Sequence, residues 1–440
     1  MNARPKLFVM MVLQFFIWGA WLPLIFGYLP SLGFSPGQQS LILNAFPVAS
    51  IIGMFFSNQW ADRTFAPEKV LVFSHLVSGF AILACGFTRD FTPFFLFMLV
   101  HCLLYVPTLS IVNSIAFANM KNPDKEFGIV RMGGTIGWIL AAWPFTLIFV
   151  NWDAVNAVQT SGFIDWLGTA LANPLTGDAA KAATRWTFIV AGVASLALAA
   201  FGLTLPKSAP RGAAMAASGG QAWAAAFRLL KHPFFMVLWL VTLVDSFVHN
   251  AYFNWTGVFL GTPQSAGGVG IAANWIAPVM SIGQVAEIVT MLALGATLKA
   301  LGWRATMVVG ILGHAARFAV YAWFPESPGM IIAIQVLHGI CYAFFFATVY
   351  IFVDAHSPKD IRTSAQGLFN LQILGIGTLL ANSICPWLLQ SVYTTGGVTD
   401  FRGLFMVPLA AASLAAIALA LFFRPATLGP VKSESAAKAA

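Results

Sequence analysis

The chain has 440 residues, of which 59% are hydrophobic and only 9% are charged. Soluble domains carry roughly a quarter charged residues, so this composition excludes an ordinary soluble globule and indicates a protein whose solvent is lipid. The net charge of +8 would suggest nucleic-acid binding in a soluble protein, but the distribution of the cations makes a nucleic-acid partner unnecessary.

A membrane-spanning helix requires roughly 20 apolar residues, and apolar segments of this length recur along the whole chain. We predict helices at 7–30, 40–60, 69–88, 92–117, 129–151, 184–205, 233–260, 271–297, 303–323, 328–353, 363–389 and 401–424. The first follows Arg4 and Lys6 but is too long for a signal peptide and lacks a clean cleavage site. We therefore expect it to be an uncleaved first transmembrane helix. The sequence therefore predicts an all-α membrane protein with twelve transmembrane helices.

The segment at 206–232, which is rich in Pro and Gly, divides the predicted helices six and six. We predict an N-terminal six-helix bundle at 1–205, a cytoplasmic linker at 206–232 with a short amphipathic piece at 221–230, a C-terminal six-helix bundle at 233–424 and a cytoplasmic tail at 425–440. Two bundles of six helices are the layout of many secondary transporters. The polar segment at 152–183 is expected to hold a short interfacial helix around Trp166 to Leu171.

The cations are distributed asymmetrically between the two sides of the membrane. With the N-terminus in the cytoplasm, 17 of the 23 Lys and Arg residues fall in cytoplasmic segments. The four on the outside are Arg89, Lys181, Arg185 and Arg402, and the remaining two, Arg131 and Arg317, lie within helices. This positive-inside pattern predicts a multi-pass protein of the cell inner membrane with both termini in the cytoplasm and the lipid bilayer as its surroundings.

Several kinds of chemistry lack their sequence signatures. The four cysteines lie in predicted helices without metal-ligand spacing, so neither a disulfide framework nor a metal site is predicted. There is no Walker motif and no nucleophile elbow in the sequence, which argues against an ATP-driven pump and against an intramembrane hydrolase. We therefore expect a protein that is not an enzyme, needs no cofactor and draws its energy from an ion gradient.

Two intramembrane charges of the second half form the first candidate site. Glu287 lies one turn from Gln284 on helix 8, and helix 9 carries Arg317. Ionisable groups at this depth are costly and usually mark a pathway, a relay or a buried pair. One interpretation is that Glu287 alternates between protonated and ionised states and pairs with Arg317 or with substrate; the other is a permanent ion pair that fixes packing.

Helix 5 carries Arg131, Thr135 and Trp138 at i, i+4 and i+7, which places them on one stripe. A planar guanidinium beside an aromatic ring suits a flat ligand rich in carbonyl groups, such as a nucleobase. The alternative is that Arg131 snorkels toward the cytoplasmic boundary.

Helices 7 and 10 contribute further hydrogen-bonding groups beside aromatic rings. Helix 7 offers Asn250, Phe253 and Asn254, and helix 10 offers His338 and Tyr342. By contrast, we expect the stripe Gln14, Trp18 and Trp21 of helix 1 to be core packing. The histidines at 75, 101, 249 and 314 are isolated in sequence and are expected to be hydrogen-bonded packing residues rather than proton carriers. Asp245 is left open between a second proton site and an N-cap-like role.

Several motifs resemble those of the nucleoside:proton symporters of the major facilitator superfamily. They are Leu13 to Leu22, Ala61-Asp62-Arg63 with His75, Tyr105 to Ser114, Arg131 to Gly137, Met280 to Glu287, Arg317-Phe318-Ala319 and Ile361 to Gly367. The resemblance implies that Arg131, Thr135, Trp138, Gln284 and Glu287 hold the nucleoside. One departure is Ala343 after Tyr342, where members of the family resemble each other in having an Asp; another is Asn250 and Phe253 in place of two amides.

We accordingly predict a monomeric alternating-access importer of nucleosides coupled to protons, with Glu287 and Arg317 as the proton-coupling residues. The alternative on the same fold is a sugar or polyol:proton symporter. A membrane receptor that binds ligand without transporting it, and a drug exporter, are the other function classes considered.

Overall fold

The structure, a computed structural model, describes residues 4–53, 66–120, 123–207, 224, 226–358 and 362–425. In these ranges it is almost entirely helical. The strands that it contains there are β1 (Thr394–Thr395) and β2 (Val398–Thr399), which form a small antiparallel hairpin.

The N-terminal half contributes six spans and a group of short helices. The spans are α1 (Arg4–Ser31), α2 (Pro36–Ile52), α4 (Pro67–Cys85), α5 (Phe91–Asn119), α6 (Pro123–Ala142) continued by α7 (Pro144–Ile148), and α11 (Trp186–Gly202). Between α7 and α11 lie α8 (Trp152–Asn156), α9 (Phe163–Ala172) and α10 (Gly177–Ala183). The short helix expected around Trp166 to Leu171 is therefore present as α9, between the two further short helices α8 and α10.

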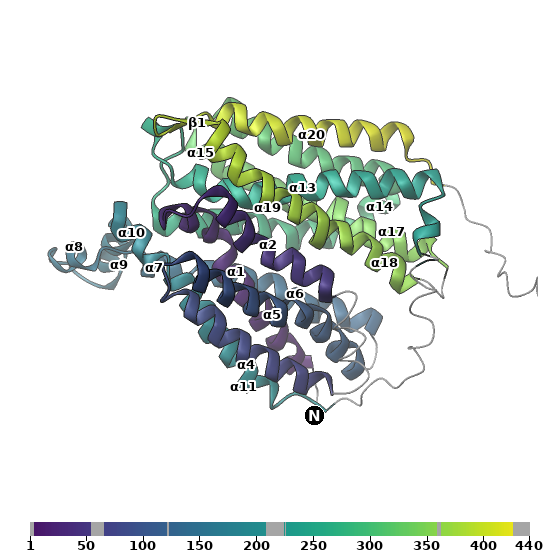
Figure 1. Ribbon diagram of the computed structural model, residues 1–440, viewed down its shortest axis with the longest axis horizontal. Coiled ribbons are helices and arrows are strands. Elements are labelled where there is room, and N and C mark those ends of the chain that lie inside the picture. The colour runs from purple at the N-terminus through teal and green to yellow at the C-terminus, as the bar shows by residue number, and fades with distance from the viewer. Residues whose placement is uncertain are drawn as a thin grey trace, which may run out of the picture.

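The C-terminal half begins with α13 (Pro233–Gly261), followed by η3 (Gln264–Ala266) and α14 (Ala273–Trp323). Its next span is built from α15 (Pro328–Ala333), η4 (Ile334–Val336), α16 (Leu337–Cys341), the π-helix η5 (Tyr342–Ala347) and α17 (Thr348–His356). The span after that consists of α18 (Arg362–Asn370), the π-helix η6 (Leu371–Ile376), α19 (Gly377–Trp387) and the π-helix η7 (Leu388–Val392), and α20 (Phe401–Phe422) ends the bundle. Figure 1 shows this half, in green and yellow, beside the purple and blue N-terminal half.

Helix α14 contains two spans rather than one. Its 51 residues would extend about 77 Å at 1.5 Å per residue, far more than the roughly 30 Å of a hydrocarbon core. Gly302, with φ 73° and ψ 176°, interrupts the helix, and glycine is the residue that adopts positive φ without steric cost. The predicted helices 271–297 and 303–323 are both present, but the loop expected between them is reduced to this break.

The helices account for twelve spans. Nine helical segments of the described ranges are long and apolar enough to cross a membrane. One of them, α14, supplies two spans, and α2 and α6 with α7 provide the other two. Of the expected amphipathic piece at 221–230, residues 224 and 226–230 are described, and the tail beyond residue 425 lies outside the described residues.

Two glycines set how closely the helices around the candidate site approach each other. A Cβ on Gly137 of α6 would overlap the backbone of Val12 on α1, and a Cβ on Gly339 of α16 would overlap the backbone of Glu287 on α14. Small residues permit such close backbone approach between membrane helices. The backbone of Glu287 is thus held directly against α16.

Candidate functional site

One side of the candidate site is built on α6. The guanidinium carbon of Arg131 lies 4.2 Å from the ring centroid of Phe15 on α1. Trp138, two turns further along, is edge-on to Trp18 with 5.3 Å between ring centroids. Arg131, Thr135 and Trp138 all keep part of their surface exposed. The predicted stripe of cation, hydroxyl and indole is therefore present, and Phe15 and Trp18 of α1 pack against it.

The opposite side is built on the first part of α14. Gln284 is buried, and its side-chain oxygen, Oε1, has no hydrogen-bond partner. Glu287 is partly exposed and interacts electrostatically with Arg131 of the other half. Tyr342 of η5 interacts electrostatically with the same two residues. A cation from one bundle, a carboxylate from the other and a phenol thus share one location between the halves.

Helix α13 closes the side of the site near Trp138. The rings of Trp138 and Phe253 lie edge to face, with 6.0 Å between their centroids. Asn250, one turn before Phe253, is partly exposed and donates from Nδ2 to the carbonyl of Ser246, 2.8 Å away. This bond leaves the oxygen of the Asn250 amide available to a ligand.

The predicted link between Glu287 and Arg317 is not formed. Arg317 is fully buried, its Nη1 is 2.9 Å from Nδ1 of His338, and its Cζ lies 3.9 Å from the centroid of Tyr252. The physical reason is that Gly283 and Gly339 allow α16 to pack tightly on α14, and this brings His338 against α14. Among the described residues, Arg131 rather than Arg317 is the cation that acts on Glu287.

The side chains of Gln14 and Trp21 on α1 are buried packing residues, as expected, and so are two of the histidines. Gln14 is fully buried between Thr108 and His75, at 2.8 and 2.9 Å, and His101 contacts the carbonyl of Ser78 at 3.0 Å. Trp18, however, contacts the site, because its ring packs against the indole of Trp138.

The other two histidines are also hydrogen-bonded, but to partners that the sequence analysis did not connect. His314 and His249 form a chain with Asp245. The signal available in the sequence was the i, i+4 spacing of Asp245 and His249, which places them on one face of a helix.

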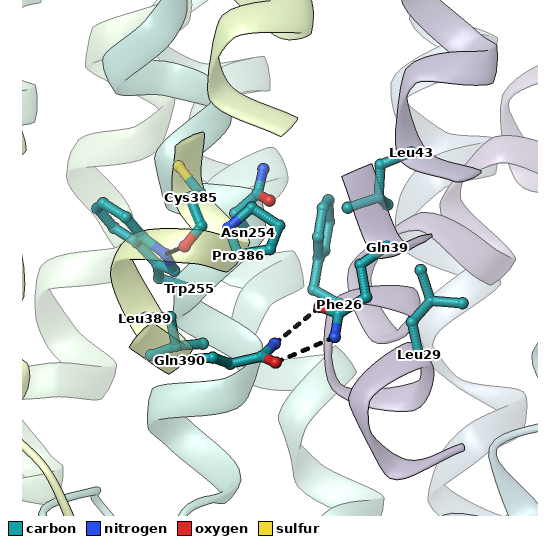
Figure 2. A pocket seen from close by; sticks show the side chains of 10 residues that line it. All are labelled: Phe26, Leu29, Gln39, Leu43, Asn254, Trp255, Cys385, Pro386, Leu389 and Gln390. Carbon is teal, nitrogen blue, oxygen red and sulfur yellow. Dashed lines mark hydrogen bonds between the residues drawn. The ribbon is translucent and has the colours of Figure 1, made fainter. Parts of the chain in front are cut away.

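A small pocket lies on the seam between the two halves, and Arg131, Trp138 and Glu287 are not among the residues that line it. It is lined by Phe26, Leu29, Gln39, Leu43, Asn254, Trp255, Cys385, Pro386, Leu389 and Gln390. Figure 2 shows the paired amides of Gln39 and Gln390 beside it. Its lining carries neither a carboxylate nor a cation, so it lacks the chemistry of the candidate site.

The seam is closed by neutral hydrogen bonds near the end of the molecule that is opposite the N-terminus. Gln39 and Gln390 exchange two bonds of 3.2 and 2.8 Å. Asn382 donates to the carbonyl of Leu43 at 2.9 Å and accepts from Asn254 at 3.1 Å. Ser383 adds further bonds to Ser40 and Asn44. We call this set of contacts the outer seal.

Comparison with known proteins decides the family. The family model described as "Nucleoside H+ symporter" matches residues 1–172 and 154–428. The chain belongs to this family. The xanthosine permease of Escherichia coli (strain K12) is 25% identical over 423 residues, which cover 92% of each protein.

Solved structures confirm the fold. The crystal structure of the nucleoside transporter NupG matches with a TM-score of 0.78 at 22% identity, covering 97% of this chain and all of NupG. The D-xylose-proton symporter matches with a TM-score of 0.67 at 14% identity, covering 95% of this chain and 98% of the symporter. This chain is a multi-pass membrane protein with the major facilitator fold of two six-helix bundles.

Proposed function

We propose that this protein imports nucleosides together with protons by alternating access. The observation that carries the proposal is the electrostatic interaction between Arg131 of the N-terminal half and Glu287 of the C-terminal half, with the unpaired oxygen of Gln284 one turn before Glu287. A ligand held by both halves can be released when the bundles rock apart, which is how carriers of this layout work. The matched family model and the names of the relatives support the substrate class.

The base of the nucleoside is expected to lie between the guanidinium of Arg131 and the indole of Trp138, with Thr135 between them on the same stripe. Arginine stacks on flat rings and donates several hydrogen bonds in a fixed plane. The sugar hydroxyls would then donate to the oxygen of Gln284 and to Glu287. A buried acceptor without a partner, such as Oε1 of Gln284, is costly until a donor arrives.

Glu287 is the proposed proton-binding residue of this site. When it is ionised it interacts with Arg131, and when it is protonated it releases Arg131 to the ligand. Proton binding and substrate binding thereby become interdependent. One proton moving down 100 mV supplies about 2.3 kcal/mol, which sustains roughly 50-fold accumulation of a neutral solute. One proton per nucleoside is therefore sufficient, and no further cofactor is required.

The proposed orientation determines which side of the membrane the outer seal faces. The positive-inside pattern places both termini in the cytoplasm of a cell whose inner membrane holds the carrier. The outer seal then faces the outside, so the seam between the halves is closed on that side. We propose a monomer as the working unit, because each chain contains both halves of the site.

A sugar or polyol:proton symporter is not favoured over this proposal. The likeness to the D-xylose-proton symporter, at 14% identity, reflects the fold alone. The family match and the xanthosine permease instead favour a nucleoside. The relatives are transporters by name, in line with the expectation that this chain is not an enzyme.

The test is uptake of labelled uridine and adenosine into proteoliposomes, with an inward proton gradient and with the gradient collapsed. The wild type should concentrate a nucleoside only with the gradient, and Glu287→Gln should lose the concentrating ability. Unlabelled nucleosides should compete, and disaccharides should not. Absence of nucleoside uptake under every gradient overturns the nucleoside assignment. Binding without uptake would instead indicate a receptor.

A further inference from the structure

A buried acid–base pair lies in the C-terminal half, outside the proposed substrate contacts. Asp245 of α13 and His314 of α14 both have fully buried side chains, and Oδ1 of Asp245 is 2.9 Å from Nδ1 of His314. The other carboxylate oxygen, Oδ2, has no hydrogen-bond partner. A buried carboxylate inside a membrane helix is costly, and such groups usually have a function.

His249 connects this pair to the substrate site. Its Nδ1 lies 3.4 Å from Nε2 of His314, and unlike Asp245 and His314 it keeps part of its surface exposed. Its ring stacks on His338 with 5.1 Å between centroids and lies 5.4 Å from Phe253. The ring of Tyr342, which interacts with Glu287, is 6.4 Å away. His249 therefore stands between the buried pair and the residues expected to hold the ligand.

The surroundings of His314 provide one negative and one positive charge. The titratable and charged groups that act on it directly, or through its histidine neighbours, are Asp245, His249, Arg317, His338 and Cys341. With His314 neutral, the carboxylate of Asp245 and the guanidinium of Arg317 balance each other. The cluster can take up one further proton as an imidazolium directly beside Asp245.

The N-terminal half carries a comparable cluster built without such charges. Its members lie on the first, third and fourth helices of the N-terminal half and are Gln14, His75 and His101. The corresponding helices of the C-terminal half carry His249, His314 and His338, which lie 235, 239 and 237 residues later in the sequence. In the N-terminal cluster His75 contacts Gln14 at 2.9 Å and Ser195 at 3.0 Å.

This cluster is closed by neutral groups. Gln14 donates to Thr108, and among the described residues neither a carboxylate nor an arginine is hydrogen-bonded to Gln14 or His75. The N-terminal half thus shows that amide, hydroxyl and imidazole groups are enough to join these three helices. The carboxylate of Asp245 is therefore an addition that joining these helices does not require.

We propose that Asp245 and His314 form a proton-binding site of the carrier, which exchanges its proton with the substrate site through His249. A proton taken up on Nε2 of His249 allows the proton on its Nδ1 to move to Nε2 of His314. His314 becomes an imidazolium whose Nδ1–H donates to Asp245. The reverse transfers return the proton, and no other bond changes.

This inference rests on the proposed function, because it assigns the path of the coupled proton. It is tested with proteoliposomes containing uridine transport activity and a pH-sensitive dye in the lumen. Wild type should acidify the lumen when a uridine gradient drives uptake. Asp245→Asn and His314→Gln should exchange labelled for unlabelled uridine within twofold of wild type, but should lose at least tenfold in both acidification and gradient-driven accumulation.

The matched control is His75→Gln in the N-terminal cluster, which should keep the wild-type ratio of protons to uridine. If wild type neither accumulates uridine nor moves protons, the proposed function fails. If wild type does both and Asp245→Asn and His314→Gln still acidify the lumen normally, this inference alone is overturned. Should Asp245→Asn not reconstitute, His249→Gln is compared in its place, and normal acidification by that variant also overturns the relay.

Discussion

The indole of Trp138 meets the ring of Phe253 at an interplanar angle of 65°, with 6.0 Å between the ring centroids. The two residues belong to different bundles, α6 and α13. Edge-to-face aromatic pairs of this kind contribute about 0.5–1.5 kcal/mol beyond the area they bury. The contact therefore lies where a base stacked on Trp138 would also touch the other half.

We expect Trp138→Ala to raise the KM for uridine at least tenfold, because the base loses its stacking surface. Trp138→Phe should retain most of the affinity, since it keeps an aromatic face. Concentration-dependent uptake in proteoliposomes measures both values. Trp143→Ala, which removes a half-exposed indole near the same helix, serves as the control. An unchanged KM in Trp138→Ala contradicts the proposed placement of the base.

Substitution of Gly339 should damage transport through the backbone of Glu287. A Cβ at this position overlaps the Glu287 nitrogen, so Gly339→Ala must push α16 away from α14. Uptake should fall at least tenfold at low uridine concentration. The control is Gly295→Ala on the same helix as Glu287, where a Cβ meets nothing within 4 Å and the helix gains roughly 0.5–1 kcal/mol. Equal activity of the two variants would show that the close approach is not required.

The outer seal has an intrinsic reporter in Cys385, which is buried and lines the seam pocket. Asn382→Ala removes the bonds to Leu43 and Asn254 and should favour opening at this end. Labelling of Cys385 by a membrane-impermeant maleimide from outside should become about fivefold faster, because the bonds lost with Asn382 together contribute roughly 1 kcal/mol to closure. Cys385→Ser should abolish the signal. No change in rate would indicate that Asn382 does not hold the seal.

Arg317 should be essential to stability rather than replaceable by another cation. Its guanidinium donates to His338 and lies over Tyr252, and the compact ammonium of lysine cannot do both. We expect Arg317→Lys to lower the free energy of unfolding by about 1–3 kcal/mol, seen as a lower melting temperature in detergent. Arg304→Lys, at an exposed position, should leave the melting temperature unchanged. Equal melting temperatures for the two variants would contradict this role.

Much of the fold and part of the site could be predicted from the sequence, for physical reasons. Hydropathy identifies transmembrane helices because lipid admits few charges, so the twelve helices could be predicted. The single break at Gly302, where a loop was expected, could not. The stripe from Arg131 to Trp138 followed from helical periodicity, which is a property of one helix. Pairing between helices has no such rule.

One wrong prediction and one missed connection at the site both concern contacts between helices. Glu287 and Arg317 were expected to pair because their helices are neighbours, but the glycines at 283 and 339 bring His338 against α14 instead. Asp245 and His314 are 69 positions apart, and a reading of one helix at a time treats each as isolated. Only the folded arrangement of α13, α14 and α16 reveals the cluster that they form with His249.

The outer seal consists of amides, hydroxyls and carbonyls, without a single ion pair among the contacts described for it. Each such bond contributes a net 0.5–1.5 kcal/mol or so, and water can replace every one of them when the seam parts. Breaking the seal separates no charges, so its energy should be nearly independent of ionic strength and of the membrane potential. The voltage dependence of transport should therefore arise from the charged groups in the middle of the protein, and raising the salt concentration should leave the rate of outward opening unaltered.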